Sequence, residues 1–398
     1  MPATSFLRQC LYTALAFGAA VALINTIVDP YLLFNRPRTT EFNARKPAVF
    51  DNEHLIKAYD VLRFKPKTLL LGTSSMAMGV DALSDAWPFS ARPVYNLGMP
   101  GEGAFGIRRY LQHVLATEHP QTVVLGLAFR DFFTLFQPKH EPPFESRLAV
   151  TDSGVPTPYL LRQRVDDIAY ATLSLDTLLE SFDTLRGNLG GDSSDIVSGN
   201  VDPYWHRSKA HMDGAYSLVV LTDFGYVQLY RDTTFEDKVW TDVRQIFDLC
   251  REHEINLTVI LEPAHVDELE VIDMVGKWNL VEQWKREFTK LASEYGDHEG
   301  RPRVELWDFF GYDAYSTESV PNTKTMLRWF LSPSHYTHAL GDLMVRRISG
   351  SGDPSFGVKL TPDTIDARLA EVRRERTVYR SGEKRDVERV RKLYAEVY

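Results

Sequence analysis

Apolar residues recur along this chain in short continuous runs, each followed by a helical or irregular stretch. Two amphipathic helices are predicted between them, over residues 105–117 and 280–295. Continuous apolar runs of this length are typical of buried strands in a parallel sheet whose crossovers are helices. The sequence therefore predicts an α/β fold, a flavodoxin-like doubly wound parallel sheet of about five strands that binds ligands at their carboxyl ends. The five runs cover residues 67–72, 93–98, 122–128, 256–263 and 303–309.

The N-terminal region carries the longest apolar segment. Residues 10–28 are 19 residues without a charge, which as a helix span about 28 Å, close to the hydrocarbon thickness of a bilayer. The apolar run continues past its small residues, which favours an uncleaved transmembrane helix over a cleaved signal peptide. Large downstream domains cross membranes largely regardless of flanking charge, so we expect a single-pass protein with a cytoplasmic tail at residues 1–9 and an extracytoplasmic bulk.

The remaining pattern predicts the domain organisation. Residues 29–65 are expected to form a juxtamembrane linker and helix, and residues 66–350 the α/β domain. More than a hundred residues separate the third and fourth runs, too many for an ordinary crossover, and we interpret residues 135–235 as a lid inserted over the site. Within it, 166–185 is helical in pattern, and the aromatics and histidines of 202–217 suit either sugar stacking or a lid core. Dense alternating charge predicts a solvated or partner-facing helical tail at 351–398.

Composition narrows the function classes. The chain has 398 residues, a formal charge of −9 and two cysteines, Cys10 and Cys250. An acidic chain lacks the basic face that nucleic acids require, and no Cys/His spacing predicts a metal site. The segment GEGAFG (101–106) formally matches a dinucleotide fingerprint, but it follows the second strand and places Glu102 toward a pyrophosphate. We therefore expect no nucleic-acid partner, no metal and no cofactor.

Candidate chemistry follows the strand ends. Ser74 comes directly after the first run, Gly98 after the second and His335 after the fifth. A serine, a base and a backbone N–H near the carbonyl oxygen are the parts that acyl transfer requires. The alternatives are structural: Ser74 as a helix N-cap, and His335 as a packing histidine.

Here the chain resembles the SGNH/GDSL-type hydrolases, in the membrane-anchored bacterial branch related to proteins of cell-wall D-alanylation and exopolysaccharide O-acetylation. The resemblance implies Ser74 as nucleophile, His335 as base, and the backbone N–H groups of Ser74 and Gly98 as oxyanion donors. It spans roughly residues 28–350, and the motifs that carry it are DPYLLF, LLLGTSS, VYNLGMPG, VVLGLAFRDFF, VILEPAH and SPSHYTHALGD.

Two positions depart from the family pattern. The third block carries Arg130 and Asp131 where the family has an oxyanion Asn, and Ser332 stands in place of the Asp of the final Asp-x-x-His block. Both could leave a slow enzyme or none, because the Asp orients the imidazolium and the Asn donates to the oxyanion. Two further residues at strand ends are candidates to line the site, Asn96 and His265.

The resemblance implies a serine acyl-esterase or O-acyltransferase of the bacterial inner membrane, facing the periplasm. Its partners would be a cell-surface polysaccharide or acyl donor and, beside it in the membrane, an acyl exporter. The alternative is a catalytically degenerate SGNH-fold protein that binds glycan or acts as a scaffold in envelope polysaccharide assembly. The two departures favour this alternative, whereas the order of Ser74, Gly98 and His335 favours the enzyme.

Overall fold

The computed structural model describes residues 3–133, 142–189, 225–296, 303–320, 327–382 and 384–397. The chain divides into two compact units. The helical unit comprises Met1–Phe64 and His140–Pro203, and the α/β unit comprises Lys65–Lys139 and Tyr204–Tyr398. Each unit is described by itself below.

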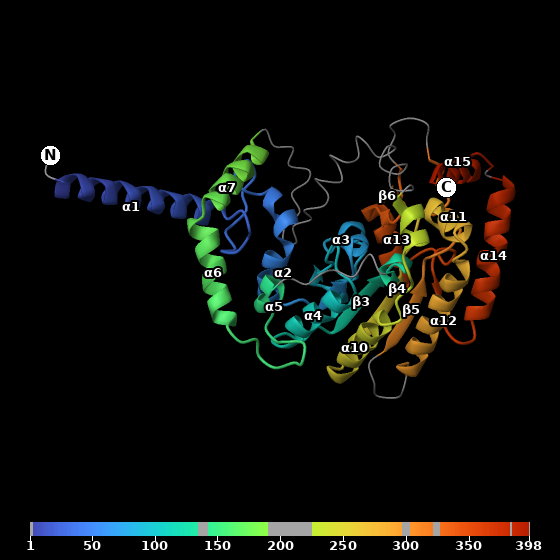
Figure 1. Ribbon diagram of the computed structural model, residues 1–398. Helices are drawn as coiled ribbons and strands as arrows, with labels where there is room; N and C mark the ends of the chain where they lie inside the picture. The colour runs from blue at the N-terminus through green and yellow to red at the C-terminus, as the bar shows by residue number, and fades with distance from the viewer. Residues whose placement is uncertain are drawn as a thin grey trace. The chain divides into compact units, whose positions relative to one another are not determined.

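A six-stranded sheet forms the centre of the α/β unit (Figure 1), with strand order β2-β1-β3-β4-β5-β8. The first five strands in this order are parallel and β8 is antiparallel to β5. Each predicted run contains one of the parallel strands, so the five strands predicted from apolar runs are confirmed. The strands are β1 (Thr68–Leu71), β2 (Val94–Asn96), β3 (Thr122–Leu127), β4 (Asn256–Leu261), β5 (Val304–Asp308) and β8 (Val358–Lys359).

Both faces of the sheet are covered, which explains why the strands read as continuous apolar runs. Leu70, Val124 and Ile260 point into one core cluster, where Met76 and Leu340 pack against them. Their neighbours along the strands point to the other face, where α4, α10 and α12 lie (Figure 1). The helices of this unit are α3 (Ser74–Gly79), α4 (Ala104–Leu115), α10 (Val239–Glu252), α11 (Val266–Met274), α12 (Trp278–Glu294), α13 (His338–Ile348), α14 (Ile365–Gly382) and α15 (Lys384–Val397), with 3-10 turns η2 (Phe89–Ala91) and η3 (Phe129–Phe132).

The C-terminal residues belong to the α/β unit and are not a separate solvated tail. Strand β8 joins the sheet, and in α14 Arg368 donates to Oδ2 of the fully buried Asp308 at 3.0 Å. Arg380 is ion-paired with Glu270 of α11. The alternating charge that predicted a solvated helix therefore anchors α14 to the unit by ion pairs.

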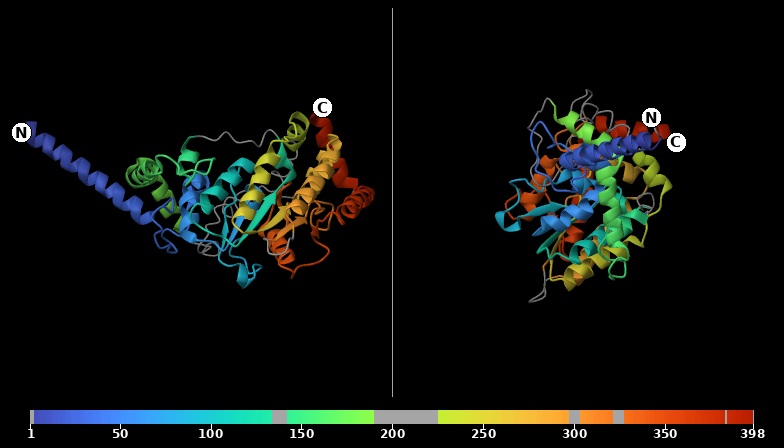
Figure 2. Two further views of the ribbon diagram at one scale, coloured as in Figure 1. Left: turned by 90° about the horizontal axis from the view of Figure 1, so that it is seen from below. Right: turned by 90° about the vertical axis from the view of Figure 1, so that its left-hand side faces the viewer.

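The helical unit is built around the predicted membrane span. Its helix α1 (Ala3–Val28) has a mean hydropathy of 1.9 over its most apolar window, enough to cross a membrane. Figure 2 shows α1 leaving the rest of the unit as a long rod, with its C-terminal end against the other helices. These are α2 (Glu53–Phe64), α5 (Pro142–Arg147), α6 (Leu160–Leu173) and α7 (Leu175–Asn188), with a 3-10 turn η1 (Pro47–Asn52).

The range predicted as a lid, residues 135–235, is divided between the two units. Residues 140–203 group with the N-terminal residues, and α6 and α7 pack against α1. The helical pattern of 166–185 is real but broken at Ser174, whose extended backbone ends α6 and whose hydroxyl caps α7. The aromatic and histidine residues of 202–217 lie outside the described residues.

Candidate functional site

Ser74 and His335 meet at the carboxyl edge of the sheet. The Oγ of Ser74 lies 2.8 Å from Nε2 of His335. Ser74 is the first residue of α3, directly after β1, and Thr73 holds the N-cap position without a side-chain capping bond. The prediction that Ser74 is merely a helix N-cap is therefore wrong, because its hydroxyl bonds the imidazole.

A tight antiparallel hairpin presents the histidine. Strands β6 (Phe330–Ser332) and β7 (His335–Tyr336) pair Ser332 directly with His335. Ser332 Oγ lies 2.7 Å from His335 Nδ1, and Ser334 Oγ lies 3.2 Å from the same atom. The tautomer that lets Ser74 donate to Nε2 puts the ring proton on Nδ1, where Ser332 Oγ accepts it. Ser332 thus lies beside the ring nitrogen that does not face Ser74.

The surroundings of His335 keep its imidazole neutral. Ser74 and His335 are each partly accessible, whereas the serines around them are buried. Burial, with the positive charge of Arg130, lowers the pKa of His335 to about 3. In the described ranges no carboxylate lies within ion-pair distance of this ring. The imidazole is consequently neutral and free to accept a proton, but the imidazolium formed by that step is supported only by hydroxyl oxygens.

Arg130 lies behind the pair. It follows β3 in η3, is 3% exposed, and donates to Ser75 Oγ at 2.5 Å and to the backbone carbonyl of Ser334 at 3.1 Å. Ser75 Oγ donates to the same carbonyl at 2.7 Å. These bonds tie the residue after Ser74 to the residue before His335. Arg130 therefore positions both partners, and its guanidinium donates to Ser75 and Ser334.

Two buried carboxyls lie near Arg130. Glu262 follows β4 and accepts from the hydroxyl of Tyr336 at 3.0 Å, while Glu268 of α11 accepts from the hydroxyl of Tyr230. Burial raises the pKa of Glu262 to about 8 and that of Glu268 to about 7, and the charge of Arg130 opposes both shifts. Glu262 is therefore predominantly a neutral acid at pH 7.

Gly98 lies where the prediction placed it, but its N–H is engaged. The group donates to Oδ1 of Asn96 at 2.9 Å, and the Nδ2 of Asn96 donates to the carbonyls of Met76 and Val80 at the end of α3. A Cβ on residue 98 would come within 2.6 Å of the Ala77 nitrogen, so glycine allows β2 to approach α3 closely. As an oxyanion donor Gly98 would first have to release Asn96, whereas the N–H of Ser74 lies in the first turn of α3, where no intrahelical acceptor exists.

The other two candidates have structural contacts. Nε2 of His265 lies 2.6 Å from the carbonyl oxygen of Glu318, and Nδ1 accepts from the Asp267 backbone N–H at 3.3 Å, capping α11. Its backbone N–H donates to the carbonyl of Pro333 at 2.7 Å, so His265 supports the hairpin of His335. Asp131 is buried, which raises its pKa, and accepts from the Ala128 N–H at 2.8 Å.

The sequence reasoning missed several residues of this site. Tyr226, whose hydroxyl bonds Ser334 Oγ, lies in the helical run 225–232 within the predicted lid, and its pattern gave no signal. Glu262 could have been found from the sequence, because it directly follows an apolar strand and therefore lies at the same edge of the sheet as Ser74. Ser75 and Ser334 adjoin the nucleophile and the base, and their role depends on Arg130 reaching both.

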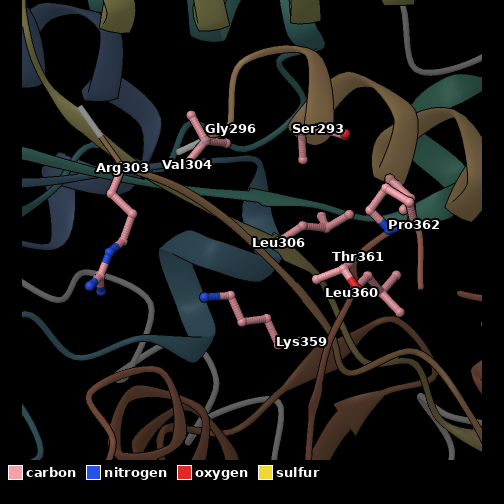
Figure 3. Close-up of a pocket in the computed structure, with 11 residues that line it drawn as sticks. Ser293, Gly296, Arg303, Val304, Leu306, Lys359, Leu360, Thr361 and Pro362 are labelled. Atoms are coloured by element: carbon pink, nitrogen blue, oxygen red, sulfur yellow. The ribbon is translucent and has the colours of Figure 1, made fainter. Parts of the chain in front are cut away.

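A separate cavity of 420 Å³ lies at the amino end of β5, between α12 and β8 (Figure 3). It is away from the strand ends that hold Ser74 and His335. At the GEGAFG segment the carboxylate of Glu102 lies against Gly106, so an acid stands at the start of α4 where a pyrophosphate would bind. Among the residues that the structure describes, no group of three His, Cys, Asp or Glu side chains is arranged to hold a metal ion.

Comparison with known proteins gives no family assignment: no family model matches the chain, and no curated protein matches it.

Proposed function

We propose that the chain is an SGNH-like serine acyl-esterase or O-acyltransferase that acts on O-acyl esters of a cell-surface polysaccharide. The observation that carries the proposal is the contact of Ser74 Oγ with His335 Nε2 at 2.8 Å, with Nδ1 held by Ser332 at 2.7 Å. A hydroxyl within hydrogen-bond reach of an oriented neutral imidazole is the arrangement that activates serine as a nucleophile.

The fold supports the same proposal. The strand order 2-1-3-4-5 of the parallel strands is that of flavodoxin-like sheets, in which ligands bind where the chain switches sides, between β1 and β3. Ser74 follows β1 and Arg130 follows β3, so the candidate site lies at this switch point.

The reaction would proceed in two steps. His335 Nε2 takes the proton of Ser74 as Oγ attacks the acyl carbon, and the Ser74 N–H donates to the oxygen that becomes negative. Nε2 then returns the proton to the leaving sugar oxygen, which leaves an acyl group on Ser74. Water or a second sugar hydroxyl then attacks this ester while Nε2 takes its proton, and Nε2 returns that proton to Ser74 Oγ as the bond from Oγ to the acyl carbon breaks, which regenerates Ser74. The acceptor distinguishes an esterase from a transferase.

The apolar helix α1 supports a proposal for the location of this reaction. We propose a single-pass protein of a bacterial inner membrane with the α/β unit in the periplasm. There α1 would anchor the chain in the membrane across which an exporter delivers the acyl donor. Asn25 of α1 is buried and accepts from Ser181 Oγ at 3.0 Å, which supports an uncleaved anchor, because cleavage would remove part of the folded unit.

A second function has its own support, a scaffold or glycan-binding protein with a degenerate site. The N–H of Gly98 is engaged by Asn96, and His335 has hydroxyl partners in place of a carboxylate. Loss of one oxyanion donor lowers the rate by about 10²–10³ in a well-studied protease. These two features predict a slow enzyme at best.

Covalent labelling separates the two functions. The full-length protein in detergent is incubated with a fluorophosphonate probe, beside Ser74→Ala and His335→Ala, with His338→Ala as the matched histidine control. The enzyme predicts labelling of wild type and the control, and its loss in the first two variants. Absence of labelling in folded wild type would favour the scaffold.

A further inference from the structure

Helix α7 is amphipathic, but it buries its polar side and exposes its apolar side, the reverse of a surface helix in a soluble protein. Its buried side is polar, consisting of Thr177, Ser181, Thr184 and Asn188. Its exposed side carries Leu175, Leu179 and Phe182, spaced i, i+4 and i+7, with exposed fractions of 56%, 63% and 51%. A helix of a soluble protein turns such an apolar stripe toward the core.

Helix α6 continues this surface. Leu161, Val165 and Ile168 share one face at the same spacing and are 76%, 55% and 49% exposed. Its buried residues are Asp167 and Ala171. Two neighbouring helices of one unit therefore present apolar stripes outward, whereas scattered single leucines would need no explanation.

The corner between these helices is fastened to the end of the membrane helix. Asn25 Nδ2 donates to the carbonyls of Thr172 at 3.1 Å and Ser174 at 3.2 Å. Asn25 lies three residues before the end of the apolar segment, about 4.5 Å along the helix axis. On the same side of α1 Val21 and Val28 are buried. The α6–α7 corner thus lies alongside the last turns of α1, near the end of its apolar segment.

We propose that α6 and α7 lie in the membrane interface, with their apolar stripes in the acyl region of the leaflet from which α1 emerges. Figure 1 shows both helices running across the C-terminal end of α1, as elements parallel to a membrane crossed by α1 would. Burial of about 5–10 Å is usual for such helices, and Asn25, which fastens the corner, lies about 4.5 Å inside the end of the apolar segment. The proposal goes beyond the reaction proposed above and does not depend on it.

Charge indicates how the surface would bind. Residues 155–189 contain three arginines and five acidic residues. This excess of acids gives no attraction to anionic lipids, so the binding is apolar. It also follows that zwitterionic lipid suffices and that salt has little effect.

The test measures depth in the bilayer at single positions. Full-length protein carrying Cys10→Ser is reconstituted into phosphatidylcholine nanodiscs, one copy per disc, with Cys250 retained because it is buried. A spin label is attached to Leu161→Cys, Ile168→Cys, Leu179→Cys or Phe182→Cys, and to the exposed controls Asp166→Cys and Asp183→Cys. Collision with oxygen reports lipid exposure, and collision with a nickel chelate reports water exposure.

We expect the oxygen-to-nickel collision ratio at the four apolar positions to exceed that at the controls several-fold. Equal, high nickel accessibility at all positions would overturn the proposal, because the stripes would then face water. Shielding of the four positions from both reagents would also overturn it, because another protein surface would then cover them. Shielding from both reagents that is found where several copies share a vesicle, and not in discs with one copy, would identify a second copy as that surface and would overturn the proposal as well.

Discussion

Both units bury polar side chains, but the two buried sets differ in kind. The set at the candidate site of the α/β unit is ionisable, Arg130, Glu262 and Glu268, whereas the set between α1 and α7 of the helical unit is neutral, Asn25, Thr177 and Ser181. Elsewhere the helical unit buries charged side chains as well. Burying an ionisable group in a low-dielectric interior shifts its pKa and costs stability unless an opposite charge balances it. Groups with shifted pKa values cluster at functional sites. Neutral hydroxyls and amides instead join helices closely, as in membrane proteins. The difference between these two sets accords with the proposed chemistry in one unit and the proposed membrane packing in the other.

Removing the charge of Arg130, a member of the ionisable set, is expected to have the largest effect on stability. Arg130→Met removes two charge-assisted hydrogen bonds and the cation that balances the nearby carboxyls, so we expect the free energy of unfolding to fall by about 3–5 kcal/mol. Denaturant titration of the full chain in detergent measures it. Arg244→Met, at a partly exposed ion pair with Glu294, is the control and should cost under about 1 kcal/mol. Equal losses would contradict a central role of Arg130.

Ser332→Asp sharpens the comparison by adding the carboxylate that the site lacks. A carboxylate on Nδ1 stabilises the imidazolium, so the pKa of His335 should rise from about 3 by about one to three units. A raised pKa means protonation at higher pH, so the acid limb of probe labelling should move upward by the same amount. Labelling at neutral pH should become faster.

The control for that variant is Ser332→Asn, because the asparagine side chain has nearly the same shape as aspartate and carries no charge. It should leave the acid limb where wild type has it. If Ser332→Asp behaves like Ser332→Asn, the hydroxyl at 2.7 Å from Nδ1 does not act on the base, and the role given to Ser332 is wrong.

Changing Asn25, a member of the neutral set, is expected to lower the stability by a smaller amount. Asn25→Leu leaves the carbonyls of Thr172 and Ser174 and the hydroxyl of Ser181 without this partner, so we expect a loss of about 1–3 kcal/mol. Thermal unfolding in detergent micelles measures it, with Leu23→Ala, at an exposed position of α1, as the matched control. If Asn25→Leu is no less stable than the control, the end of α1 is not part of the folded unit.

The last prediction concerns Glu262. Its pKa is raised from 4.5 to about 8 on folding, so between these values the folded state holds a proton that the unfolded state has lost. Stability therefore falls as pH rises through this window. Glu262→Gln removes the proton exchange, and its unfolding free energy should fall less steeply, by up to about 1.4 kcal/mol per pH unit. Identical slopes for wild type and Glu262→Gln would show that Glu262 ionises normally; the exposed Glu252→Gln serves as control.

The sheet could be predicted because each parallel strand is buried on both faces and so reads as an uninterrupted apolar run. Ser74 was predictable for a related reason, since the ends of parallel strands meet at one edge, whereas His335 comes from a separate antiparallel hairpin, β6–β7, and not from the end of a parallel strand. Strand β8, with two residues, leaves no such pattern. The engagement of Gly98 had a local signal, because an Asn two residues earlier commonly accepts from such an N–H.

The rest depended on contacts that no local pattern specifies. Arg130 reaches Ser75 and Ser334 from a different strand end, and Tyr226 arrives from a segment predicted as lid. The lid over the site stays a prediction, since Tyr226 of the predicted range contacts Ser334 while α6 and α7 of the same range pack against α1. The spacing of Leu175, Leu179 and Phe182 shows an apolar stripe in either case, and only the structure shows that it points outward.

The most direct test of the central claim is to trap the acyl group on Ser74. The full-length protein is mixed with 4-nitrophenyl acetate, quenched in acid within the first turnover, digested and analysed by mass spectrometry. The account predicts acetyl on the peptide that contains Ser74 in wild type, and no acetyl there in His335→Ala. Folded wild-type protein whose Ser74 peptide stays unmodified, or is acetylated equally without His335, would contradict it.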